Sequence, residues 1–352
     1  MSDIIRVGLI GAGGNTKSRH IPGLLAVPGV EIAAVCNRRP ESTAATATEF
    51  GIPRTFERWQ DLVTDTRIDA IVIGTWPYLH CEITLAALDA GKHVLTEARL
   101  AMNAAEAHRM LAASKGHPTL VAQVVPSPFG LTYDAHVRKL IADGYLGEVR
   151  EVEVVGRNGA LADPSAPLSW RQDAALSGLN MLALGILHET LLRWIPQPSR
   201  VAAEARAAIP MRVDPAGIRR QVGTPDIVHV IASNDDGVST TYQLSGVTRF
   251  GGGMWIKLYG SEGFLHYDLA TDQLYGQSAH DSALREIEVP ASQRGQWRVE
   301  ADYIDSIRTG APVRYTDFAT GVAYMEFTEA VARSAEQSEI AHLPLPGLSE
   351  LD

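Results

Sequence analysis

A glycine-rich stretch near the N-terminus has the residue types and spacing of a phosphate-binding turn. It follows the largely apolar residues 4–7, begins with Gly8, Leu9 and Ile10, and continues as Gly11, Ala12, Gly13, Gly14, Asn15, Thr16. In a turn between a strand and a helix, glycines let backbone N–H groups approach a pyrophosphate, whose negative charge the helix N-terminus favours. Thr16 replaces the third glycine of the G-x-G-x-x-G pattern, so a turn that binds nothing is the alternative. We expect this stretch to bind a dinucleotide.

The residues after the second expected strand bear on which dinucleotide binds. That strand, residues 30–36, ends in Asn37, Arg38 and Arg39. NAD-binding folds of this kind place an acidic residue near this point to bond the ribose hydroxyls, whereas a guanidinium suits the 2′-phosphate of NADP. The sequence therefore favours NADP(H), with NAD(H) possible. The alternative for the two arginines is a solvated strand end.

Two ionisable residues follow the buried strand expected at 93–96. Glu97 and Arg99 come directly after it, with Ala98 between them. Ligands of open parallel sheets bind beyond the carboxyl ends of the strands, so both side chains are expected at the binding edge. Glu97 could orient substrate or cofactor. Arg99 stays protonated, so it could bind an anionic substrate but could not accept a proton. The alternative for Arg99 is a surface or inter-domain ion pair.

The first third of the chain alternates strands and helices. Apolar strands are expected at 69–74, 93–96 and 120–125, and glycines at 51, 91 and 116 end the helices between them. Asn103 and Glu106 have the spacing of a capping box at a helix start. Such repeated units predict an α/β Rossmann domain with a doubly wound parallel sheet over residues 1–125.

The pattern changes after Pro126. Strand-like segments are expected at 149–155, 201–208, 227–232, 239–244, 254–259 and 264–267, with few long helices between them. They predict an α+β domain over residues 126–352, with a large, mostly antiparallel open sheet. Helices are expected at 131–142 and 320–336, and a very apolar one at about 176–195.

Composition limits the partners. The chain has 352 residues and a formal net charge of −10, and no basic block offsets that charge. This argues against a nucleic-acid partner or an anionic membrane surface. There is no apolar stretch of about 18 residues, so we expect a soluble, cytoplasmic protein. Cys36 and Cys81 lack metal-ligand spacing, and no metal site is predicted.

Taken together, these segments resemble the glucose-fructose oxidoreductase / inositol dehydrogenase / MocA (Gfo/Idh/MocA) family over nearly the whole chain. The matching motifs are His20-Ile21-Pro22, Gly74-Thr75-Trp76-Pro77 with His80, residues 91–97 followed by Leu100-Ala101, Gly147-Glu148-Val149, and Gly260-Ser261-Glu262-Gly263. The resemblance implies a Rossmann domain followed by an α+β domain whose open sheet pairs subunits into a homodimer or homotetramer. It also implies oxidation or reduction of a sugar or cyclitol carbon with tightly held NAD(P).

The chain departs from the family's pattern where the chemistry is done. The family usually has Glu-Lys-Pro where this chain has Glu97-Ala98-Arg99, so Ala98 replaces a lysine that sits by the nicotinamide and the reacting hydroxyl. The family's aspartate and histidine correspond to Ala183 and Leu187. His188 follows one residue late, about 100° round a helix, so it cannot simply replace that histidine. Alanine and leucine cannot transfer the hydroxyl proton.

These departures leave a limited set of candidate site residues. The expected catalytic residues are Glu97, His188 and Arg99, with a satisfied core histidine as the alternative for His188. The expected cofactor-binding residues follow strands and are Gly11, Ala12, Gly13, Gly14, Asn15, Thr16, Asn37, Arg38, Arg39, Thr75, Trp76, Pro77, His80 and Glu97. The expected substrate-binding residues are Tyr78, Trp170, Arg171, Asp173, Asn180 and His188. Packing, helix capping and loop ion pairs are the alternatives for these residues.

Three functions fit this pattern. The first is an NAD(P)-dependent oxidoreductase acting on a CH–OH group of a sugar, sugar derivative or cyclitol, with an atypical acid–base set. The second is a glycosidase or lyase that retains the cofactor for transient redox without net oxidation. The third is a catalytically inactive nucleotide- or sugar-binding protein, which the losses at Ala98, Ala183 and Leu187 would explain. A small carbohydrate-like substrate is expected, but the fold does not set its identity.

Overall fold

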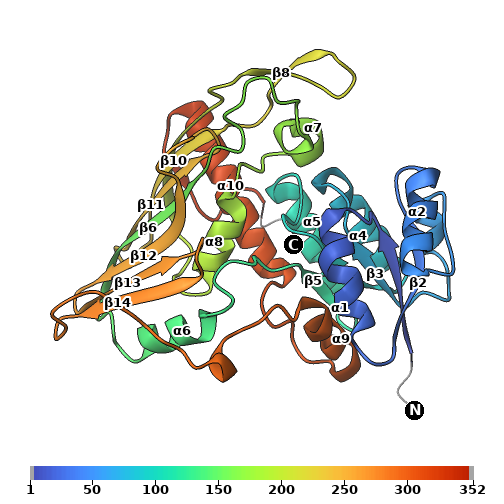
Figure 1. Cartoon of the computed structure of the whole chain (residues 1–352), viewed down its shortest axis with the longest axis horizontal. Coiled ribbons are helices and arrows are strands. Elements are labelled where there is room, and N and C mark those ends of the chain that lie inside the picture. The colour runs from blue at the N-terminus through green and yellow to red at the C-terminus, as the bar shows by residue number, and fades with distance from the viewer. Residues whose placement is uncertain (1–3, 349–352) are drawn as a thin grey trace. The chain divides into compact units, whose positions relative to one another are not determined.

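The computed structural model describes residues 4–348, which divide into two compact units (Figure 1). One unit holds the described residues up to Pro126 together with Arg298–Val322. The other holds Ser127–Trp297 and the described residues from Ala323 onward. The domain boundaries expected from the sequence, 1–125 and 126–352, stay a prediction, and their outermost residues, 1–3 and 349–352, lie outside the described part.

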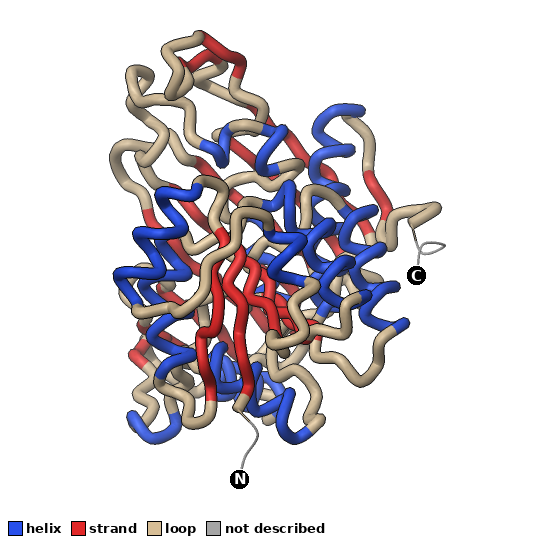
Figure 2. Tube along the Cα trace, turned by 90° about the vertical axis from the view of Figure 1, so that its right-hand side faces the viewer, coloured by secondary structure: helices blue, strands red, loops and turns tan. Residues whose placement is uncertain are grey.

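The first unit is built on a parallel sheet of five strands in the order β2-β1-β3-β4-β5. The strands are β1 Ile5–Ile10, β2 Val30–Cys36, β3 Ala70–Ile73, β4 His93–Thr96 and β5 Ala122–Val124. In Figure 2 strands of this sheet, in red, run between helices, in blue. Helices on both faces bury the strands, which explains their continuous apolar runs and confirms the predicted parallel sheet.

Helices connect the successive strands of this sheet, and one further helix comes from later in the chain. The helices are η1 Thr16–His20, α1 Ile21–Leu25, α2 Pro40–Phe50, α3 Trp59–Val63, η2 Pro77–Leu79, α4 His80–Asp89, α5 Ala104–Gly116 and α9 Val299–Thr309. Asn103 caps α5, since its Oδ1 accepts from the Glu106 N–H at 2.9 Å, and Gly51 ends α2 with a φ of 67°. Both features confirm the sequence prediction. Parallel strands place the turns after β1, β2, β3 and β4 at one edge of the sheet, called here the carboxyl edge.

The second unit is built on a sheet of nine strands in the order β15-β14-β13-β12-β6-β11-β10-β7-β16. Among its described residues, only β6 and β11 pair in parallel, which confirms the expected mostly antiparallel sheet. The strands are β6 Val149–Arg157, β7 Arg200–Arg206, β10 Ile227–Ser233, β11 Ser239–Ser245, β12 Gly253–Gly260, β13 Gly263–Asp268, β14 Gln273–Ser278, β15 Arg285–Glu286 and β16 Ala341–His342. A separate hairpin pairs β8 Met211–Val213 with β9 Arg219–Gln221.

One face of the large sheet carries the core of this unit. The ring of Tyr242 in β11 lies 5.1 Å from that of Phe327 in α10 (Phe318–Gln337), tilted by 45°. A side chain at Gly156 would lie 3.1 Å from Leu187 of α8 (Leu184–Leu192). The remaining helices of the unit are α6 Asp134–Ala142, η3 Trp170–Gln172, α7 Ala174–Ser177 and η4 Ala291–Gln293. No helix within residues 4–348 is both long and apolar enough to cross a membrane.

The prediction of a single apolar helix at about 176–195 is wrong. The segment forms α7 and α8, with an irregular connection between them. Gly178 ends α7 with a φ of 66°, and Leu182 has a φ of 45°, which a continuous helix does not allow. The apolar composition hid this break, because buried irregular chain and buried helix are equally apolar. The departures at Ala183 and Leu187 therefore lie at the start of the short helix α8.

Candidate functional site

The glycine turn packs closely against the loop after β3. Gly11 has a φ of 86°, and a Cβ there would lie 2.7 Å from the backbone nitrogen of Thr75, so only glycine fits. The Thr16 hydroxyl donates to the Gly11 carbonyl at 3.2 Å and takes up space that a side chain at Gly74 would need. Thr16 is thus accommodated in place of the third glycine, because its neighbour Gly74 has no side chain.

The outer part of the turn is open and fits a phosphate group. The Ala12 and Gly13 N–H groups are used internally, by Asn37 Oδ1 at 2.7 Å and by the Gly11 carbonyl at 3.0 Å. Gly13, Gly14 and Asn15 are exposed, and a Cβ at Gly14 would meet no atom within 4 Å. Helix-start N–H groups have no acceptor within their own helix, so the amides from Gly14 onward suit a dinucleotide's pyrophosphate.

Asn37 braces the turn against α2. Its Oδ1 accepts from Ala12, while its Nδ2 donates to the Ser42 carbonyl at 3.0 Å and to Thr46 Oγ1 at 3.2 Å. The carboxamide is therefore committed to the fold and does not take the place of a ribose-binding carboxylate. Arg38 and Arg39 follow it as exposed side chains, at the carboxyl edge where a 2′-phosphate would lie.

Glu97 directly follows β4, and its side chain is hydrogen-bonded to the glycine turn. Its N–H donates to the Ile73 carbonyl at 3.0 Å, which fixes its backbone beside β3. Its Oε1 accepts from Asn15 Nδ2 and from His20 Nε2, the latter at 3.0 Å. The Glu97 side chain keeps 16% of its surface exposed, so the carboxylate is held from inside the fold while part of it reaches solvent.

His20 lies behind Glu97 and is fully buried between two carboxylates. Its Nδ1 is 2.5 Å from Oε1 of Glu300, a residue of α9 whose side chain is 3% exposed. Carboxylates only accept, so both ring nitrogens donate, and the ring is the doubly protonated imidazolium. Burial works to lower the pKa of His20, but the hydrogen bonds and charges of Glu300 and Glu97 outweigh it and raise the pKa to about 9. Burial would likewise raise the pKa of Glu97, yet His20 holds that pKa below its usual value.

His80 ties together the loops after β3 and β4. Its Nε2 lies 3.0 Å from the Thr75 carbonyl, and its Nδ1 lies 3.0 Å from the Arg99 carbonyl and 3.2 Å from that of Leu100. Burial is the main cause that lowers its pKa. The geometry makes His80 a positioning residue for Thr75 and Arg99. Arg99 itself is 8% exposed, and the peptide bond before it is cis.

The loop after β3, which holds expected cofactor- and substrate-binding residues, is partly open. Trp76 precedes η2, and Trp76 and Tyr78 are half-buried, whereas Pro77 is buried. Through its carbonyl, Thr75 is the member of this loop held by His80. The first unit thus brings Gly11, Asn15, Thr75, His80 and Glu97 together at the carboxyl edge.

His188 lies in the core of the second unit. Its Nε2 donates to Gln197 Oε1 at 2.9 Å, its Nδ1 accepts from the Tyr242 hydroxyl at 2.7 Å, and its ring stacks on Phe327 at 3.7 Å. Burial lowers the pKa of His188 to about 4, so the ring stays neutral. Both nitrogens are used and the side chain is 1% exposed, so the geometry favours the core-histidine alternative over an acid–base or substrate-binding role.

The other expected substrate residues surround η3 and α7 of the second unit. The Arg171 guanidinium lies 4.3 Å from the centre of the Trp170 ring, and Arg171 is exposed. Asp173 caps α7 by accepting from the Ala175 N–H at 3.0 Å, and it lies 3.6 Å from Arg220. Asn180 is buried and donates to the Ser177 carbonyl at 2.6 Å. Trp170 and Arg171 therefore keep accessible surface, while Asp173 and Asn180 have structural bonds.

The sequence analysis did not assign His20 or Glu300 to the site. His20 was visible in the motif after the glycine turn, but nothing in its spacing showed that it faces Glu97. Glu300 is 280 residues away in the chain, and its approach depends on Gly23, where a Cβ would lie 2.6 Å from Glu300 Oε2. Only the folded chain brings these two residues together.

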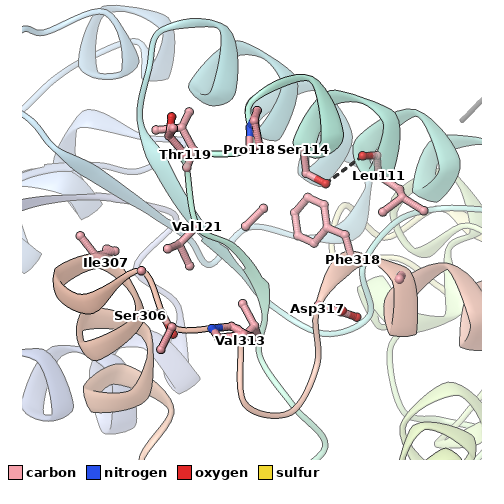
Figure 3. A pocket seen from close by; sticks show the side chains of 16 residues that line it. Leu111, Ser114, Pro118, Thr119, Val121, Ser306, Ile307, Val313, Asp317 and Phe318 are labelled. Carbon is pink, nitrogen blue, oxygen red and sulfur yellow. Dashed lines mark hydrogen bonds between the residues drawn. The ribbon is translucent and has the colours of Figure 1, made fainter.

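A pocket of about 520 Å³ lies elsewhere in the first unit. Figure 3 shows it between α5, the chain leading into β5, the end of α9 and the start of α10, with Phe318 and Val121 among its lining residues. The residues before β5 mark the amino edge of the sheet, opposite the glycine turn. Asp317 is its one ionisable lining residue, and that side chain accepts from the Thr320 N–H at 2.8 Å, so the pocket offers little chemistry. Within residues 4–348, no cluster of His, Cys, Asp and Glu has the grouping of a metal site.

Comparison with known proteins agrees with this arrangement. The chain is 29% identical over 203 residues to an uncharacterised oxidoreductase of Rhizobium meliloti, which covers 57% of this chain and 59% of that protein. It is 30% identical over 187 residues to the levoglucosan dehydrogenase of Pseudarthrobacter phenanthrenivorans, which covers 51% of this chain and 47% of that protein. These matches span less than two thirds of either relative. A solved levoglucosan dehydrogenase in complex with NADH and L-sorbose shares the fold, with a TM-score of 0.87 and 24% identity over 98% of this chain and 100% of that one.

Family models cover most of the chain. Residues 5–124 match the model described as "Oxidoreductase family, NAD-binding Rossmann fold", and residues 135–266 match the "GFO/IDH/MocA C-terminal domain". These matches confirm the resemblance found in the sequence. The chain therefore belongs to the Gfo/Idh/MocA family of oxidoreductases.

Proposed function

We propose that the protein is an NAD(P)-dependent oxidoreductase acting on a CH–OH group of a sugar, a sugar derivative or a cyclitol. The observation that carries the proposal is the partly exposed Glu97 carboxylate at the carboxyl edge, bonded to the glycine turn through Asn15. A Gfo/Idh/MocA relative named for levoglucosan supports the substrate class. The acid–base set differs from the family's usual one, since Ala98, Ala183 and Leu187 cannot exchange a proton.

Oxidation of a CH–OH group removes a proton from oxygen and a hydride from carbon, leaving a carbonyl. The nicotinamide of a bound cofactor supplies the hydride acceptor. Glu97 accepts the hydroxyl proton, because its carboxylate lies at the carboxyl edge and part of it reaches solvent. Arg99, which stays protonated, binds an anionic group of the substrate. Trp76 and Tyr78, which follow β3, offer accessible surface for substrate contacts. Substrate binding by Trp170 and Arg171 stays a prediction from the sequence.

NADP(H) is the proposed cofactor. The Asn37 carboxamide is committed to Ala12, Ser42 and Thr46, so the position that usually recognises NAD carries neither a negative charge nor a free acceptor. Arg38 and Arg39 bring two positive charges next to it. A 2′-phosphate gains charge-assisted hydrogen bonds from such side chains, and a ribose hydroxyl gains less.

Purified protein, incubated with NADP⁺ or NAD⁺ and a panel of sugars, sugar acids and cyclitols, tests the activity. An absorbance increase at 340 nm that depends on the substrate and is lost in Glu97→Gln supports the proposal. Glycoside cleavage without net absorbance change, by protein that retains cofactor, favours a glycosidase or lyase instead. If calorimetry shows that the protein binds neither cofactor, the oxidoreductase proposal fails, and the catalytically inactive binding protein is the remaining alternative.

We also propose that the large sheet of the second unit pairs copies of the chain. The face opposite its core carries half-exposed aromatic and charged side chains in neighbouring strands. Tyr259 pairs with Phe264 across β12 and β13, and Lys257 pairs with His266 in the same register. Aromatic residues are enriched in protein interfaces. Light scattering on purified protein should give a dimer or tetramer, and Phe264→Glu should shift it to monomer.

A further inference from the structure

Three residues from separate parts of the first unit form a line of alternating charge. Glu300 comes from α9, His20 from the end of η1, and Glu97 from the residue after β4. His20 Nδ1 lies 2.5 Å from Glu300, and Nε2 lies 3.0 Å from Glu97. Glu300 and His20 are buried, and Glu97 alone of the three has an appreciable exposed fraction. Glu97 is therefore the member of this line that a ligand can reach directly.

We propose that His20 and Glu300 are positioning residues that keep the Glu97 carboxylate charged and joined to Asn15, so that the end of β4 and the glycine turn bind the cofactor as one piece. The inference rests on the cofactor binding in the proposed function and adds residues to it. Asn15 belongs to the glycine turn, and its Nδ2 donates to the same Glu97 oxygen that His20 contacts. Loss of the imidazolium charge would thus loosen both the carboxylate and the turn.

The packing around Glu300 is specific to this contact. A Cβ at Gly23 of α1 would lie 2.6 Å from Glu300 Oε2 and 2.8 Å from its Cγ. Glycine at this position lets the Glu300 side chain pass beside α1 and reach His20. A buried carboxylate is costly to keep unless it is paired, and the imidazolium is the partner that this route reaches.

The charged groups that face His20 are Glu300 on α9 and Glu97 after β4. Glu97 also faces His80 of α4, whose pKa burial lowers. Of these two histidines, His20 is the one whose pKa is raised, to about 9. The proposed coupling then predicts a loss of cofactor affinity as the pH rises through this value.

Fluorescence titration with NADPH from pH 6 to pH 10.5 tests the inference. For wild-type protein we expect a constant Kd up to about pH 8 and a Kd that rises by up to roughly tenfold per pH unit above the pKa of His20. Glu300→Gln keeps an acceptor for His20 Nδ1 but removes the charge. The rise of Kd on the alkaline side, called here the alkaline limb, should therefore move to lower pH. Asp305→Asn, an equal charge change at a half-exposed position of the same helix, should leave the limb in place.

Two results would overturn the inference. One is wild-type binding that is flat across this pH range, and the other is a limb that stays at the same pH in Glu300→Gln. If Glu300→Gln does not fold, NMR titration of wild-type protein labelled at histidine decides instead. A histidine that titrates near pH 9 supports the inference, and the absence of any histidine titrating above about pH 7.5 contradicts it. Failure to bind NADPH or NADH at every pH would contradict the proposed function, and the NMR titration would still decide whether His20 is charged.

Discussion

Asn37 Oδ1 accepts a hydrogen bond from the backbone N–H of Ala12 at 2.7 Å, which joins the end of β2 to the glycine turn. Asn37 lies at the carboxyl edge, but the hydrogen bonds of its side chain are all made within the fold. Under the proposed preference for NADP(H), the residues that would contact a 2′-phosphate are its neighbours Arg38 and Arg39, whose side chains are exposed. Two predictions follow from this division of roles.

Arg38→Ala should weaken NADPH binding about tenfold or more and change NADH binding little. A charge-assisted hydrogen bond contributes about 1.5–3 kcal/mol, which corresponds to a factor of roughly 10–100 in Kd. Fluorescence titration with both reduced cofactors measures the ratio. Arg58→Ala, which removes an exposed arginine before α3, is the matched control and should leave the ratio unchanged. An equal loss for both cofactors would show that Arg38 does not contact the 2′-phosphate.

Asn37→Asp should reverse the cofactor preference at some expense of stability. The carboxylate still accepts from Ala12, but it repels a 2′-phosphate and suits ribose hydroxyls. It also loses the donors to Ser42 and Thr46, which lowers the free energy of unfolding by about 1–3 kcal/mol. Cofactor titration and urea unfolding check the two effects separately. Unchanged NADPH affinity in a folded Asn37→Asp protein would contradict the preference for NADP(H).

Much of the fold was predictable from the sequence because its signals are local. Buried strands, the cap at Asn103 and the helix end at Gly51 each depend on a few neighbouring residues. The position of Glu97 at the carboxyl edge was likewise predictable, since it directly follows a buried strand. The break in the apolar segment at 178–183 was missed, because apolar composition does not distinguish a helix from a buried connection.

The residues behind the site were not predictable in the same way. His20 and Glu300 meet only when α9 packs on α1, and no pattern of spacing relates positions so far apart in the chain. For His188, the contacts in the folded chain favour the core-histidine alternative. His188 lies one residue after the position where the family has a histidine, which suggested an acid–base role. In the structure, Tyr242, Gln197 and Phe327 surround it. Long-range contacts decide both cases.

The stability of the apoprotein should show a broad maximum that His20 limits on the alkaline side. A group whose pKa is raised on folding contributes stability that is fully present below its unfolded pKa, about 6.5, and is lost as the pH rises through about 9. Glu97, whose pKa is lowered, contributes stability above its unfolded pKa that is lost as the pH falls. Thermal unfolding between pH 4 and 10 measures the curve. His20→Gln should flatten the alkaline side, and a wild-type curve with no decline between pH 7 and 9.5 would contradict the charged state of His20.

His188→Leu should destabilise the protein without changing its chemistry. The substitution leaves the Tyr242 hydroxyl and the Gln197 side chain without their partner in the core, which costs about 1–3 kcal/mol for each unsatisfied group. Because His188 is 1% exposed and its pKa is lowered to about 4, the ring stays neutral at neutral pH and is shielded from a substrate in solvent. We therefore expect a lower midpoint of urea unfolding with kcat and its pH profile unchanged for the folded fraction. Tyr242→Phe removes the same hydrogen bond from the other side and should give a smaller loss of stability. A kcat that falls at least a hundredfold in His188→Leu, with Tyr242→Phe unaffected, would restore the acid–base role that the sequence suggested.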